Sequence, residues 1–190
     1  MKHILKKVLI FVLVFSIGAL SGCGGAKTPE TAVGEKVNIS VLREGETELL
    51  EAEVIAGNVV DYTMAVCLDY FSPFFVETVD IYSYENWPGE ENVYFGVSAF
   101  EGDKSTFKEG MKTQYANSFE SVSFEKTKIA GYKATAAYLN GDKEHPGYNT
   151  TVFLVEGETT ALIIDVRYAA EMAEGLYQII MSCLNTLVIK

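Results

Sequence analysis

Val93-Tyr94-Phe95-Gly96-Val97-Ser98-Ala99-Phe100 is the stretch that decides the fold of this 190-residue chain. Aromatic and β-branched residues fill it, and these residues are typical of a β-strand. The turn Glu101-Gly102-Asp103 follows at once. Apolar residues then recur at the spacing of one helix face, which predicts a helix over residues 105–118. A strand followed by an amphipathic helix indicates a domain that contains both kinds of element.

The predicted helix has an apolar stripe and a recognisable start. The stripe consists of Phe107, Met111 and Tyr115. Thr106 and Glu109 have the spacing of a capping box, in which each side chain bonds to the backbone of the other residue. Gly110 weakens the helix modestly.

Alternating patterns predict four strands before this point and four after it. They cover residues 37–42, 47–55, 60–68, 74–82, 122–129, 132–139, 148–155 and 160–168. Ser72-Pro73 interrupts the chain before the fourth strand, and Asn140-Gly141 is a hairpin signal inside a longer polar loop to Gly147. One face of the third strand is predicted to hold Tyr62, Met64, Val66 and Leu68. A helix over residues 169–186 is predicted to point inward with Leu176, Ile180, Cys183, Leu184 and Leu187.

This order of elements indicates an α+β fold. We expect a mostly antiparallel sheet with an internal helix and a C-terminal helix packed on it, preceded by an N-terminal β-hairpin. Residues 37–190 are long enough for a single domain, in which residues 37–57 form the hairpin and residues 58–190 the main module.

The first 22 residues have the pattern of a signal peptide. A basic start precedes a 13-residue apolar run, Val8 to Leu20. A helix of that length covers roughly 20 Å, which is short of the roughly 30 Å hydrocarbon core of a membrane. Leu20-Ser21-Gly22-Cys23 resembles a bacterial lipobox, and the resemblance implies that Cys23 receives a diacylglycerol. Residues 23–36 then form a flexible tether. An uncleaved anchor with an incidental cysteine is the alternative.

Charge and cysteines limit the choice of partners. Residues 1–22 hold three lysines and no acidic residue, so the remaining chain has a formal charge of −14. Nucleic acid is not expected as a partner, because phosphate contacts need clustered Lys and Arg. Cys67 and Cys183 lie in apolar contexts and are expected to be buried free thiols; a disulfide between them is the alternative outside the cytoplasm.

No catalytic or cofactor constellation is recognisable in the sequence. His145 lies in a polar loop, and no Gly-x-Ser-x-Gly elbow positions a nucleophile. We therefore expect no enzyme activity and no cofactor. Acidic loops leave a calcium hypothesis open, although solvated turns are the simpler interpretation. Its possible ligands are Asp142, Glu144, Glu90, Glu91 and the backbone oxygens of Asn140 and Gly141.

Trp87 is the most interesting aromatic residue, because it lies in a loop between strands. Such a tryptophan either folds back onto the sheet or, with Tyr82 and Tyr84, forms a contact for a ligand or partner. Both interpretations stay open at this point.

From about Val60 to Lys190 the pattern resembles the PsbP/Mog1-like fold, which is found in many small bacterial lipoproteins. The resemblance rests on the order of the segments Tyr94-Phe95-Gly96-Val97-Ser98, Asp103-Lys104-Ser105, Ile129-Ala130-Gly131-Tyr132-Lys133-Ala134, Ala161-Leu162-Ile163-Ile164-Asp165-Val166 and Leu184-Asn185-Thr186-Leu187. The hairpin before it is similar to a segment in lipoproteins of Gram-positive anaerobes. The resemblance implies a non-enzymatic accessory or binding module, lipid-anchored on the outer face of a cell membrane, with an envelope protein as partner. A small-ligand or solute-binding or sensing lipoprotein is the alternative.

Overall fold

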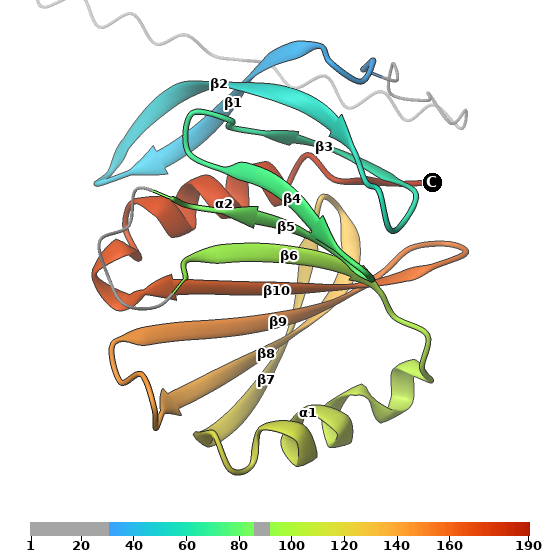
Figure 1. Ribbon diagram of the computed structural model, residues 1–190, viewed down its shortest axis with the longest axis vertical. Helices are drawn as coiled ribbons and strands as arrows, with labels where there is room; N and C mark the ends of the chain where they lie inside the picture. Colours follow the sequence, from blue (N-terminus) through green and yellow to red (C-terminus); the bar gives the residue numbers. More distant parts are fainter. Residues whose placement is uncertain (1–30, 86–91) are drawn as a thin grey trace, which may run out of the picture. The chain divides into compact units, whose positions relative to one another are not determined.

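The computed structural model describes residues 31–85 and 92–190 (Figure 1). Thr31–Lys190 forms one compact unit. It consists mostly of antiparallel strands with two α-helices, which confirms the predicted α+β class. The predicted signal peptide and Cys23 lie outside the described residues, as does Trp87.

The strands form two separate sheets, and every pairing is antiparallel. The four-stranded sheet has the order β1 (Lys36–Arg43), β2 (Glu46–Ala56), β3 (Tyr62–Val66) and β11 (Val188–Ile189). The seven-stranded sheet has the order β4 (Ser72–Val76), β5 (Val79–Ser83), β6 (Tyr94–Ala99), β10 (Ala161–Ala169), β9 (Tyr148–Glu156), β8 (Tyr132–Asp142) and β7 (Phe119–Ile129). The predicted strand Val93–Phe100 corresponds to β6, in the interior of the larger sheet.

The main hydrophobic core lies between the two sheets, and α2 (Leu176–Leu184) is part of it (Figure 1). This helix buries Leu176, Ile179, Ile180, Cys183 and Leu184. Leu187, which follows it, is only 2% exposed. The predicted inward-facing residues are therefore confirmed. A helix that is apolar on most of its surface suits a position between two layers.

A smaller hydrophobic cluster lies on the opposite face of the seven-stranded sheet, beneath α1 (Phe107–Tyr115). Phe107 is buried there, with Met111 and Tyr115 packed against the cluster, so the predicted stripe is confirmed. The capping box is wrong: Thr106 makes no side-chain cap bond. Instead the Asp103 carboxylate accepts a hydrogen bond from the Ser105 amide at 2.8 Å, and a 3₁₀ turn (Lys104–Thr106) leads into the helix.

The segment predicted as one strand over residues 74–82 is two strands. β4 and β5 form a tight hairpin with Val76 opposite Val79. The turn places Glu77 at φ 45°, a conformation that favours glycine. Because a glutamate stands at this position, the sequence contains no typical turn residue that would predict the hairpin. Pro73 lies within β4, which is an edge strand and can accommodate a residue without an N–H. Leu68 was predicted to share one strand face with Tyr62, Met64 and Val66; it lies beyond the end of β3 and is 41% exposed, so this part of the prediction is wrong.

The C-terminal segment is more divided than the sequence predicted. A 3₁₀ turn (Ala170–Met172) precedes α2, which ends at Leu184, two residues before the predicted end, and the short strand β11 follows at Val188–Ile189. The Asn140-Gly141 pair lies within β8 rather than at its end, so the loop to β9 covers residues 143–147. Ala130 and Gly131, both with positive φ, make the tight turn between β7 and β8.

Candidate functional site

Tyr82 is a core residue, so it does not belong to the ligand or partner contact that the sequence left as one of two interpretations. Its side chain is 2% exposed and its ring stacks on Phe95 with centroids 4.6 Å apart. Its hydroxyl lies 2.7 Å from the hydroxyl of Tyr62 in β3. Burial raises the pKa of Tyr82 to about 12. The pair joins the two sheets through a buried hydrogen bond.

Asp80 completes this buried network. Its carboxylate accepts hydrogen bonds from the backbone amides of Asn58 and Val59, at 3.0 and 3.2 Å, and from the Tyr62 hydroxyl at 3.1 Å. Burial raises the pKa of Tyr62, with Tyr82 and Asp80 as further causes. The loop between β2 and β3 is thereby attached to β5, the strand that leads to Tyr84.

Tyr84 is the predicted contact residue that reaches a surface pocket. Its backbone amide donates to the Val93 carbonyl at 2.9 Å, and its half-buried ring packs edge-on against Phe71 with centroids 6.5 Å apart. The ring therefore has a fixed position at one wall of the pocket.

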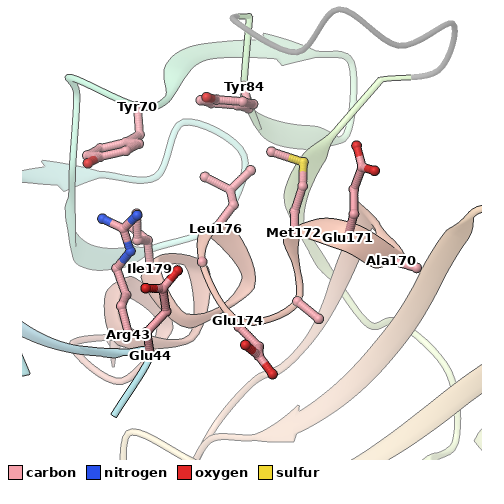
Figure 2. A pocket seen from close by; sticks show the side chains of 12 residues that line it. Arg43, Glu44, Tyr70, Tyr84, Ala170, Glu171, Met172, Glu174, Leu176 and Ile179 are labelled. Atoms are coloured by element: carbon pink, nitrogen blue, oxygen red, sulfur yellow. The ribbon is translucent and has the colours of Figure 1, made fainter. Parts of the chain in front are cut away.

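This pocket has a volume of about 470 Å³ and lies at the N-terminal end of α2 (Figure 2). Tyr84, Leu176 and Met172 gather at its centre, with Tyr70 on one side. Its lining consists of Arg43, Glu44, Tyr70, Tyr84, Ala170, Glu171, Met172, Ala173, Glu174, Gly175, Leu176 and Ile179.

Three turns hold these side chains in place. Arg43 is the last residue of β1, and Glu44, in the turn to β2, has a φ of 51°. After β3, the backbone amides of Tyr70 and Phe71 both donate to the Cys67 carbonyl at 3.0 Å. Before α2, the Gly175 amide donates to the Met172 carbonyl at 3.2 Å. Residues far apart in sequence meet here because each turn ends an element of the same core.

The electrostatics of the pocket combine an apolar floor with a mostly acidic rim. Glu44, Glu171 and Glu174 are exposed carboxylates around it. Arg43 is the cation of the lining, and its guanidinium forms an ion pair with Glu48 at 3.1 Å. The arrangement suits a partner group that carries positive charge on an apolar stem.

The loop of the calcium hypothesis is organised around Asp142. Asp142 is only 7% exposed, and its Oδ1 accepts hydrogen bonds from the backbone amides of Glu144 and His145, both at 3.0 Å. The other oxygen lies 3.5 Å from Arg167 and 3.7 Å from His145 Nδ1. Asp142 therefore binds the protein's own donors. Glu90 and Glu91 lie outside the described residues.

Cys67 and Cys183 are buried free thiols that lie side by side. A hydrogen bond joins their side chains; it lowers the pKa of Cys67 and raises that of Cys183. The sequence left a disulfide open between these residues, and the structure has them reduced and in contact.

Sequence reasoning missed most of the pocket. The residues that it missed come from three separate segments, and nothing in their local patterns distinguishes Arg43, Tyr70, Met172 and Leu176 from turn or core residues.

Within residues 31–85 and 92–190, no helix has the length and apolar content needed to cross a membrane. A scan against protein-family models and a search of curated proteins found no match to this chain.

Proposed function

We propose that this protein is a lipid-anchored, non-enzymatic binding module on the outer face of a bacterial cell membrane, with the domain arranged like a PsbP/Mog1-like module. Leu20-Ser21-Gly22-Cys23 supports the anchor, because a diacylglyceryl group supplies two acyl chains and two chains make attachment stable. The proposed partner is another protein of the cell envelope.

The pocket of Figure 2 is the observation that carries the binding role. Two tyrosines, a methionine and a leucine give it an apolar floor, and aromatic and methionine side chains are frequent at protein interfaces. Three exposed glutamates surround them. We expect a partner segment with a lysine or arginine whose aliphatic stem covers Leu176 and whose charge reaches the carboxylates.

Crosslinking in intact cells tests the binding role. A photoreactive phenylalanine analogue replaces Tyr84, and the same analogue at Lys128 on the far edge strand β7 is the matched control. We expect a reproducible crosslinked protein from position 84 and none from position 128. The double substitution Glu171→Lys with Glu174→Lys should abolish that product because it reverses the charge of the rim. Equal products from positions 84 and 128 would contradict the assignment of the pocket.

The same experiment separates the alternative, a small-ligand or sensing lipoprotein. In that case no crosslinked protein forms, and native mass spectrometry of the purified chain shows a bound small molecule that Tyr84→Ala removes.

The anchor has its own test. Metabolic labelling with a lipid precursor should mark the wild-type chain, whereas Cys23→Ala should carry no label and leave the membrane fraction. A labelled Cys23→Ala variant would show that the lipid is attached elsewhere.

A further inference from the structure

A second pocket lies on the face of the seven-stranded sheet that α1 covers, and it shares no lining residue with the pocket of Figure 2. It measures about 220 Å³ and is located where the C-terminal end of α1 meets the ends of five strands. Its lining consists of Tyr94, Tyr115, Ser118, Phe119, Asp142, Glu144, His145, Thr150, Asp165 and Arg167.

Asp165 and Arg167 lie on the same face of β10, because successive side chains of a strand point to opposite faces. Residues two apart share a face and have Cα atoms roughly 7 Å apart. Asp165 lies opposite Gly96, which has no side chain, and Arg167 lies opposite Tyr94. A carboxylate and a guanidinium therefore line one pocket at a fixed separation.

Asp165 is the unusual member of this pair. The Tyr94 hydroxyl donates to its Oδ2 at 3.1 Å. Its Oδ1 is shielded from solvent and accepts no hydrogen bond from the part of the chain that the structure describes. Burial raises the pKa of Asp165. A buried acceptor without a donor is rare in folded proteins and costs free energy until a donor reaches it.

Tyr148 and Asp142 are two of the residues that hold Arg167 in place. Its guanidinium carbon lies 5.3 Å from the centre of the Tyr148 ring, and its Nη2 lies 3.5 Å from Asp142. Asp142 is itself fixed by the amides of Glu144 and His145. A guanidinium has five N–H donors in a fixed plane, so Arg167 can bind a ligand carboxylate in addition to the protein groups that it contacts.

We propose that this pocket binds a small zwitterion, a free α-amino acid, whose ammonium group donates to Asp165 Oδ1 and whose carboxylate binds Arg167. The volume of about 220 Å³ suits a molecule of that size. Asp142, Glu144 and Asp165 outnumber the single arginine, so a purely anionic ligand is disfavoured. Tyr94, Tyr115 and Phe119 give the ligand's carbon atoms an aromatic wall.

This assignment is independent of the proposed partner pocket, since it uses other residues on another face. The lipidated mature protein in detergent micelles is titrated by calorimetry at pH 7 with glycine, L-alanine, D-alanine and L-serine. Ethylamine and propionate, which each carry only one of the two charged groups, are the controls on the wild-type protein. We expect saturable binding of at least one amino acid and at least tenfold weaker binding of both controls.

Two variants test the named residues. Asp165→Asn and Arg167→Lys should each weaken binding of the amino acid at least tenfold. The first substitution removes the negative charge, and the second replaces the planar guanidinium with an ammonium group. Asp61→Asn, the same chemical change at an exposed residue, is the matched control and should bind as the wild type does. Thermal melting without ligand verifies that each variant is folded. The proposal is overturned if no amino acid binds, if ethylamine or propionate binds equally well, or if folded Asp165→Asn keeps full affinity.

Discussion

Removal of the Asp80 carboxylate should destabilise the fold far more than removal of the neighbouring Tyr82 hydroxyl. In Asp80→Ala, the backbone amides of Asn58 and Val59, the side-chain amide of Asn58 and the Tyr62 hydroxyl lose their shared acceptor. The two backbone amides have no other acceptor in the described chain, whereas the Tyr62 hydroxyl still lies 2.7 Å from Tyr82. The two amides should therefore carry most of the cost.

The magnitude follows from the number of donors. A buried group without its partner costs about 1–3 kcal/mol. The bonds of Asn58 and Val59 are only part-buried, so each backbone amide should cost about 1 kcal/mol, and with the weakened Tyr62 hydroxyl we expect a loss of about 3 kcal/mol for Asp80→Ala. In a domain of this size, that corresponds to a decrease in Tm of about 6–12 °C. Tyr82→Phe removes only one hydrogen bond and should cost about 1 kcal/mol. Asp80→Asn keeps one acceptor oxygen and should fall between the two.

Urea unfolding at pH 7, followed by circular dichroism on the chain expressed from residue 24, measures these three variants against the wild type. The m-value should stay constant, because the same surface is exposed on unfolding. If Asp80→Ala costs no more than Tyr82→Phe, the loop between β2 and β3 is not held by this carboxylate and the reasoning is refuted.

Three further outcomes are expected in the same assay. Gly110→Ala should stabilise α1 by about 0.5–1 kcal/mol, since no atom lies within 4 Å of the added Cβ, and a loss would refute the helix position. Gly57→Ala should cost several kcal/mol, because its Cβ would overlap the ring of Tyr62; an unchanged urea midpoint would contradict that packing. Glu77→Gly should stabilise the β4–β5 hairpin by about 1 kcal/mol, because it relieves the positive φ, and it should leave the m-value unchanged.

The pH dependence of stability should differ between the wild type and Asp165→Asn. Burial raises the pKa of Asp165 above 3.8, so the folded wild type holds this proton more tightly than the unfolded chain does. Stability from this group is therefore fully present below pH 3.8 and is lost as the pH rises through the folded pKa. Relative to the variant, the wild type should become less stable from pH 4 to pH 7, and parallel profiles would contradict the burial of the charge.

Local patterns predicted the elements that have one apolar face and one more polar face. The strand at Val93–Phe100 and the four strands after α1 appear within a few residues of their predicted bounds, because one face of each meets a core. The division of residues 74–82 into two strands was missed because Glu77 adopts a glycine-like conformation without being glycine. Local sequence does not record a conformation that the tertiary structure imposes.

The sites were less predictable than the fold. Tyr84 was identified as a contact candidate and lines a pocket, whereas Tyr82, two residues earlier on the same face, is buried under the other sheet. Asp165 and Arg167 have the alternation of an exposed polar face, and only the position of α1 turns that face into a pocket wall. Such positions depend on contacts between distant segments.

The pairing of β11 with β3 has a consequence for how this chain is made. Val188 lies opposite Thr63, and the nearby Ala65 amide bonds to the Thr186 hydroxyl across 121 residues of sequence. During synthesis from the N-terminus, the edge of β3 that pairs with β11 has no partner until residues 188–189 have been added. The four-stranded sheet therefore cannot close while those later residues are still inside the ribosome. A chain with this topology completes this sheet only when nearly all of it has been synthesised.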